Sequence, residues 1–132
     1  MTTARKRGAD FEQHACQFLT AQNLTIIATN YTAHHIGEID IIALQQVAQK
    51  DGSYQQTLVF VEVKARKHSQ FAKAIETITP KKQKRIINTA WHFLQNHEIY
   101  ESLACRFDVV AFEIDERQTI GVDWVQGAFW VA

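Results

Sequence analysis

The sequence predicts one α/β domain over residues 1–132, in which helices flank a mixed β-sheet. The chain has 132 residues, 46% of them hydrophobic and 21% charged, which is enough apolar material for a single packed core. Stretches with helical spacing and short β-branched runs follow one another in the order αβββαβ, which is typical of a sheet with helices packed on it. No repeat and no linker rich in Pro, Gly or Ser divides the chain.

The N-terminal part is expected to form a helix and then a strand. Over residues 10–22 apolar side chains recur at helical spacing and make one stripe, formed by Phe11, Ala15, Phe18 and Leu19. Asn23 is expected to end this helix. The β-branched run over residues 24–28 is expected to be a short strand.

Two further strands are expected to pair as a hairpin. Gly37 opens an apolar run that reaches Leu44, and a second apolar run covers residues 57–65. Residues 45–56 between them are polar and contain the turn signal Asp51-Gly52. We expect this polar segment to be the connection of the hairpin.

The C-terminal part is expected to add a helix and a strand. Thr79-Pro80 indicates a helix start, because a hydroxyl caps a helix and Pro fits its first position. The helix that follows has one inward stripe, formed by Gln83, Ile86, Ile87, Ala90 and Leu94. Residues 106–114 are expected to be a strand and residues 121–132 an edge strand. The tryptophans are expected to lie in the core rather than to stack on bases: Trp91, Trp124 and Trp130.

The composition excludes several classes of protein. The longest apolar runs, such as residues 58–61, fall far short of the roughly 20 residues that span a bilayer. No apolar run follows the basic start, so no secretory signal is visible. Cys16 and Cys105 are too few for a disulfide framework and lack metal-ligand spacing. We expect a cytoplasmic protein with buried, reduced thiols and no membrane partner.

Charge is spread unevenly along the chain, although the net charge is zero. Residues 62–92 carry eight basic side chains against Glu62 and Glu76. Such a run is either a solvated face or an anion site for a partner such as a phosphate backbone. Cations near a helix start oppose the helix dipole, unless an anion docks there. The candidate nucleic-acid-binding residues are therefore Arg66, Lys67, Lys81, Lys82 and Arg85.

The chemistry-bearing residues are carboxylates and a lysine on the two hairpin strands. Because side chains alternate along a strand, Glu38 and Asp40 are expected on one face, and so are Glu62 and Lys64. One interpretation is a pair of cross-strand ion pairs at a solvated rim. The other is a site for Mg²⁺ or Mn²⁺, held by Asp40, Glu62 and the carbonyl of Val63. Lys64 would then orient an attacking water or neutralise charge on a phosphate.

These motifs resemble a known family. Gly37-Glu38-Ile39-Asp40, followed by residues 60–66 with the sequence Phe-Val-Glu-Val-Lys-Ala-Arg, is similar to the YraN-like proteins of the PD-(D/E)XK nuclease superfamily. The resemblance covers nearly the whole chain and includes Arg7-Gly8, Glu12, Asn30, Phe71, residues 81–85 and residues 106–110. It implies a restriction-endonuclease-like fold, with the archaeal Holliday-junction resolvases as a close structural comparison. The fold is implied more firmly than the reaction.

The resemblance also implies roles for matching residues. Asp40, Glu62 and Lys64 match the aspartate, the acid and the lysine of the superfamily motif. Glu12 matches the first-helix glutamate that supports metal or water. Ile39 stands where the superfamily has Pro, as is normal for YraN-like chains, and Phe11 stands where many members have Gly. Gln83 matches a glutamine that points into the site of related nucleases, although a partly exposed glutamine at a helix end is an equal alternative.

Together these observations predict metal-dependent hydrolysis of nucleic-acid phosphodiester bonds, endonuclease-like, with DNA favoured over RNA and branched DNA among the candidate substrates. A first alternative is a non-catalytic nucleic-acid-binding module that keeps the nuclease fold. A second is an interaction protein that binds an acidic partner through the basic helix. Homodimerisation stays open. His34-His35 is expected to be a solvated turn.

Overall fold

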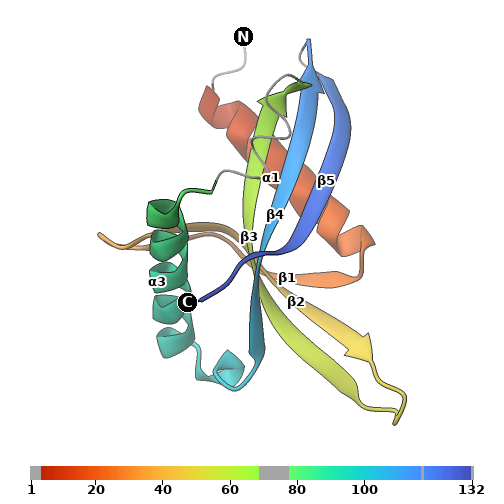
Figure 1. Ribbon diagram of the computed structural model, residues 1–132, viewed down its shortest axis with the longest axis vertical. Coiled ribbons are helices and arrows are strands. Elements are labelled where there is room, and N and C mark those ends of the chain that lie inside the picture. Colours follow the sequence, from red (N-terminus) through yellow and green to blue (C-terminus); the bar gives the residue numbers. More distant parts are fainter. Residues whose placement is uncertain (1–3, 69–77, 117, 132) are drawn as a thin grey trace.

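The computed structural model describes residues 4–68, 78–116 and 118–131, with side chains from Asp10 onward. Phe71, which belongs to the family resemblance, lies outside the described residues. The elements in chain order are α1 (Ala4–Ala21), β1 (Leu24–Ala33), β2 (Gly37–Ala48), β3 (Tyr54–Lys67), α3 (Pro80–Asn96), the short 3₁₀ helix η2 (Glu98–Tyr100), β4 (Ala104–Asp115) and β5 (Gln118–Phe129) (Figure 1).

The strands form one five-stranded sheet in the order β1-β2-β3-β4-β5. Neighbouring strands are antiparallel except β3 and β4, which are parallel because the chain crosses over through α3 between them. β5 lies at the edge beside β4, where the apolar tail was expected. The predicted class, a mixed sheet flanked by helices, is confirmed, and β5 extends the expected order.

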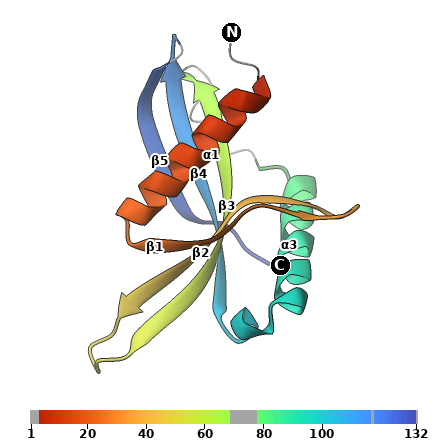
Figure 2. The same cartoon turned by 180° about the vertical axis from the view of Figure 1, so that it is seen from behind.

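The two helices pack against opposite faces of the sheet (Figures 1 and 2). On one face Ala15 and Leu19 of α1 join a core cluster with Val59 and Val61 of β3. On the other face, α3 contributes Ile86, Ala90, Phe93 and Leu94 to a cluster that includes Leu58 and Phe60 of β3. β3 is therefore buried on both sides, which explains its continuous apolar run.

The ends of several elements differ from the predicted ones. α1 begins at Ala4, well before residue 10, because a polar first turn needs no apolar stripe to stay helical. It ends as predicted, and Asn23 has a left-handed φ of 69°. The predicted hairpin forms, and its turn includes Asp51-Gly52 as expected, but the connection is shorter than the polar segment: residues 45–48 belong to β2 and residues 54–56 to β3, with Gln46 opposite Gln56. Backbone pairing needs no apolar face in an exposed arm, so hydropathy did not mark it.

The β2–β3 ladder stops at the pair Ile41–Val61. Beyond that pair, β1 and β2 turn away from β3 and run past α3 (Figures 1 and 2). β2 also rotates about its axis here. Ile39 and Ile41 would share a face on a regular strand, but Ile39 packs on the α3 side with Ile42, whereas Ile41 packs on the α1 side. Strict alternation of side chains therefore does not hold along this part of β2. The separation of β2 from β3 opens the region of the candidate site.

The prediction that all three tryptophans lie in the core is wrong for two of them. Trp91 is 54% exposed on α3, and Trp130, which follows the end of β5, is 65% exposed. Trp124 is half-buried, and its indole N–H donates to Asp108 over 2.9 Å. The fully buried Asp108 also accepts hydrogen bonds from Arg106 and from the backbone N–H of Gly127. This carboxylate links β4 to β5 and is structural.

Other expectations concern the cysteines, the histidine turn and membrane spans. Cys16 and Cys105 are free, and both are half-buried rather than fully buried. His34 and His35 are exposed in a turn, as predicted. None of the helices in the described part of the chain is long and apolar enough to cross a membrane.

Candidate functional site

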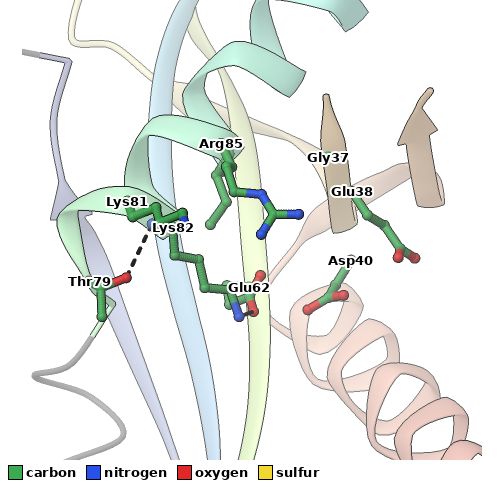
Figure 3. Close-up of a pocket in the computed structure, with 9 residues that line it drawn as sticks. Gly37, Glu38, Asp40, Glu62, Thr79, Lys81, Lys82 and Arg85 are labelled. Atoms are coloured by element: carbon green, nitrogen blue, oxygen red, sulfur yellow. Dashed lines mark hydrogen bonds and ion pairs between the residues drawn. The ribbon is translucent and has the colours of Figure 1, made fainter. Parts of the chain in front are cut away.

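Two clefts meet where β2 leaves β3. The carboxylate cleft, about 490 Å³, is lined by Phe11, Glu12, Asp40, Glu62, Val63, Lys64, Ala65, Arg66, Lys82 and Ile114. The basic cleft, about 480 Å³, is lined by Gly37, Glu38, Asp40, Glu62, Thr79, Lys81, Lys82, Arg85 and Ile86 (Figure 3). Asp40, Glu62 and Lys82 line both clefts, so the boundary between the clefts is made of charged groups.

Asp40 takes its position from the end of the strand ladder. It is the first residue of β2 beyond the Ile41–Val61 pair, and its Oδ2 accepts the Val63 N–H over 2.8 Å. Burial raises the pKa of Asp40 to about 7, and the charge of Glu62 adds to the rise, while the Val63 hydrogen bond opposes it. The surroundings of the Asp40 side chain thus disfavour its ionised form.

Glu62 faces Asp40 from β3 and forms an ion pair with α3. Its Oε1 lies 2.6 Å from Lys82 Nζ, and the side chains are 11% and 46% exposed respectively. In Figure 3 Asp40 points toward Glu62, whereas Glu38 extends away from it. The structure therefore brings Asp40 and Glu62 together, while Glu38 lines the basic cleft with Asp40 but is exposed.

Lys64 follows Glu62 on the same strand and lines the carboxylate cleft. It is only 9% exposed, and burial lowers its pKa, with the positive charge of Lys82 as the next cause. Charges on Glu62 and Asp40 oppose that decrease in pKa. Lys64 thus shares the lining of one cleft with the two carboxylates.

Glu12 reaches the same cleft from α1. The helix is anchored beneath it by Phe11, whose ring lies 5.5 Å from that of Phe112, and by the buried Ala15. The charge of Glu12 contributes a smaller part of the rise in the pKa of Asp40. Glu12 is thus near the carboxylate pair, as expected from the first helix.

The helix start places basic side chains around the basic cleft. Thr79 caps α3, and its Oγ1 accepts the backbone N–H of Lys82 over 3.2 Å, as the Thr-Pro motif predicted. Lys81, Lys82 and Arg85 line the basic cleft. Because the N-terminus of a helix also carries partial positive charge, this cleft suits an anion.

The remaining candidates lie less centrally. Arg66 lines the carboxylate cleft, and its guanidinium donates to the carbonyl of Ala65 over 2.8 Å. Lys67 is exposed at the end of β3. Gln83 donates its side-chain amide to the carbonyl of Ile78 over 2.8 Å, so in this structure it supports the helix start. A catalytic role for Gln83 stays a prediction.

The oxygen atoms of the carboxylate cleft can be compared with the ligands that a hard divalent cation prefers. Among residues 4–68, 78–116 and 118–131, no three His, Cys, Asp or Glu side chains are grouped closely enough to hold a metal ion. Asp40 and Glu62 therefore need a backbone ligand. The N–H and C=O of a strand residue face the same neighbouring strand, so the Val63 carbonyl faces the β2 side with its N–H. Two carboxylates, a carbonyl and water suit Mg²⁺ or Mn²⁺.

Sequence reasoning missed the Lys82–Glu62 ion pair. Lys82 was predicted to be one of several phosphate-binding residues. Glu62 and Lys82 are far apart in the sequence, and nothing in the sequence indicates that α3 starts beside β3. The one available signal was the crowding of lysines at a helix start, where the dipole disfavours cations. That signal indicated an anion near the helix start, and in the structure the Glu62 carboxylate lies there.

Comparison with known proteins gives the family. Residues 11–112 match the model of the uncharacterised protein family UPF0102. A UPF0102 protein of Alcanivorax borkumensis is 38% identical over 130 residues, covering 98% of this chain and 96% of its own length. A UPF0102 protein of Francisella tularensis subsp. novicida is 43% identical over 124 residues, covering 94% of each chain. The chain therefore belongs to the UPF0102 family, which is the YraN-like family expected from its motifs.

Proposed function

We propose that the protein is a metal-dependent nuclease of the PD-(D/E)XK superfamily, which hydrolyses phosphodiester bonds in nucleic acid. The observation that supports it best is the convergence of Glu12, Asp40, Glu62, Val63 and Lys64 on one cleft. That cleft adjoins a second one lined by basic side chains and the start of α3. Carboxylates, a lysine and an anion-binding helix start are the groups that phosphodiester hydrolysis needs.

In this proposal Asp40, Glu62 and the Val63 carbonyl hold Mg²⁺ or Mn²⁺. The bound ion would supply Lewis acidity and lower the pKa of a bound water. The cost of burying Asp40 as an anion beside Glu62 supports the assignment, because a cation there would relieve that cost. Asp40 has the Val63 N–H as a partner, in contrast to Asp108, which is surrounded by donors.

The other residues act on substrate and water. Lys64, buried beside the carboxylates, orients the attacking water or neutralises charge that develops on the phosphate. Glu12, which does not join Asp40 and Glu62 in a three-carboxylate group, acts through water. Lys81, Arg85 and the helix start bind flanking phosphates. Such contacts fix the register of the strand without reading its sequence.

A cleavage assay tests the proposal. Linear, flapped and branched DNA, with matched RNA, would be incubated with Mg²⁺ or Mn²⁺ and with EDTA. We expect metal-dependent cleavage that Lys64→Met lowers by about 100-fold or more, while binding in EDTA persists. Asp123→Asn, on the exposed edge strand, is the control and should cleave normally.

Two results would overturn the proposal. Salt-sensitive binding of DNA or RNA, with no cleavage of any substrate and no effect of metal, would favour the binding module. Binding to acidic protein but not to nucleic acid would favour the interaction protein. The clustering of carboxylates in the cleft argues against both, because they repel a polyanion unless a cation lies between them.

A further inference from the structure

The Lys82 side chain is the feature with a role beyond phosphate binding. Its ammonium lies 2.6 Å from Glu62 Oε1, and its side chain lines both clefts. Among the described residues, it is the basic group of α3 that forms an ion pair with a carboxylate. Lys82 therefore has two competing partners, the motif carboxylate Glu62 and any phosphate that enters the basic cleft.

The surroundings allow Lys82 to leave Glu62. The backbone of Lys82 is fixed, because its N–H donates to the Thr79 cap, but its side chain is 46% exposed on a flexible four-carbon stem. Glu62 is 11% exposed and stays in place. At this distance the Lys82 ammonium occupies an oxygen of Glu62 that a divalent cation would also need as a ligand. The ammonium and the metal ion would also repel each other.

We propose that Lys82 is an exchangeable counter-ion, which pairs with Glu62 in the free protein and moves to a substrate phosphate when nucleic acid binds. This inference rests on the proposed function. Release of Glu62 lets that carboxylate bind the metal, so metal and nucleic acid favour each other's binding. The coupling must be reciprocal, because it is a property of one thermodynamic cycle. Lys82 is thus a positioning residue that links substrate binding to metal binding.

The first test measures Mn²⁺ binding to the free protein by titration calorimetry, without nucleic acid. Lys82→Gln should bind Mn²⁺ on the order of fivefold more tightly than wild type, because the competing ammonium is gone. Lys81→Gln is the matched control: it removes the same charge from the neighbouring position in the basic cleft. It should change the affinity less than twofold, since exposed charges are screened.

The second test needs neither metal nor catalysis. DNA affinity is measured in EDTA by fluorescence anisotropy for Glu62→Gln and for Glu38→Gln, which removes an equal charge from the same cleft. Glu62→Gln should raise DNA affinity more than Glu38→Gln, because it frees Lys82. In a Lys82→Gln background the two substitutions should have equal effects, since no ammonium is left to free.

The possible outcomes separate the two proposals. If wild type binds Mn²⁺ but Lys82→Gln binds it no better than Lys81→Gln does, the counter-ion role is wrong and the proposed function stands. Equal effects of Glu62→Gln and Glu38→Gln in the otherwise unchanged chain would also exclude it. If no variant binds Mn²⁺ at millimolar concentration, both proposals fail.

Discussion

Asp40 and Asp108 are two poorly accessible aspartates with opposite environments. Asp108 is fully buried but accepts hydrogen bonds from a guanidinium, an indole and a backbone amide. Asp40 accepts one backbone N–H and faces a second carboxylate, and burial with that charge raises its pKa to about 7. A structural acid is surrounded by donors, whereas an acid that lacks them destabilises the fold when ionised.

This difference predicts how stability depends on pH. The pKa of Asp40 lies above its ordinary value of 3.8, so between about pH 4 and 7 the native state binds more protons than the unfolded state. The contribution of Asp40 to the free energy of unfolding is therefore greatest below about pH 4, and it is lost as the pH rises through 7. In EDTA at pH 8, Asp40→Asn should be more stable than wild type by about 1–3 kcal/mol, measured by urea unfolding.

The same variant should gain little at pH 4, where Asp40 is protonated in the folded wild type. Asp123→Asn is the control, because it removes the same charge from an exposed position on β5. A stability difference that does not change between pH 4 and pH 8 would mean that Asp40 is an ordinary surface acid.

At the scale of residues, part of the candidate site could be predicted from the sequence. Glu62 and Lys64 follow strict alternation on a regular strand, so their common face was predictable. Side-chain directions on β2 were less predictable, because β2 rotates where its pairing with β3 stops, and no local residue pattern encodes that rotation. The Lys82–Glu62 contact depends on how α3 docks, which is a tertiary property.

At the scale of elements, the position of α3 depends on a glycine. A Cβ built on Gly37 would lie 2.6 Å from Thr89 Oγ1 and 3.3 Å from the carbonyl oxygen of Arg85. Thr89 is fully buried and donates its hydroxyl to that carbonyl, so it cannot move without breaking the bond. The start of β2 can therefore approach α3 only without a side chain at position 37.

Gly37→Ala should accordingly destabilise the fold by about 1–3 kcal/mol, the usual cost of overpacking. Thermal or urea unfolding would measure it. In a Thr89→Ala background the nearest atom is gone, so the added cost of Gly37→Ala should fall, and the double-mutant cycle should show that coupling. Additive effects of the two substitutions would mean that this contact does not position α3.

The start of α3 also predicts a salt effect on binding. Replacing Lys81, Lys82 and Arg85 together with Ala should weaken nucleic-acid binding on all sequences, because phosphate contacts carry no base information. The slope of log K against log salt should fall by about one unit for each phosphate that the variant no longer binds. Lys84→Ala is the comparison, since Lys84 is an exposed residue of the same helix outside the basic cleft. Unchanged affinity and slope in the triple variant would identify a merely solvated face.

Most elements could be predicted because each has a local cause. The Thr79 cap, the apolar stripe of α3 and the turn at Gly52, whose φ is 87°, depend only on neighbouring residues. Strand length was underestimated for β2 and β3, because their exposed arm is held by backbone pairing between polar residues. Trp91 and Trp130 were misplaced because hydrophobicity alone does not tell the covered side of a helix or sheet edge from the open side.

At the scale of the whole molecule, the site lies where separate parts of the chain meet. β2 and β3 supply Asp40 and Glu62, α1 supplies Glu12, and α3 supplies Lys82. Each group is carried by an element that packs into the core, so the cleft exists only in the folded protein. A ligand that binds there must therefore stabilise the native state against unfolding.

This linkage gives the last prediction. Mg²⁺ at millimolar concentration should raise the melting temperature of the wild type by a few degrees, because ion concentration above the dissociation constant adds to the free energy of unfolding. Asp40→Asn should lose this response while folding normally, and Asp123→Asn should keep it. Sodium chloride at equal ionic strength separates binding from screening. If instead Asp40→Asn unfolds the protein and Mg²⁺ leaves the wild-type melting temperature unchanged, Asp40 and Glu62 are structural carboxylates rather than metal ligands. If the two carboxylates hold a metal ion, Asp40→Asn should fold normally and Mg²⁺ should raise the melting temperature of the wild type. Both results follow because the repulsion between the carboxylates is relieved either by the bound ion or by the loss of one charge.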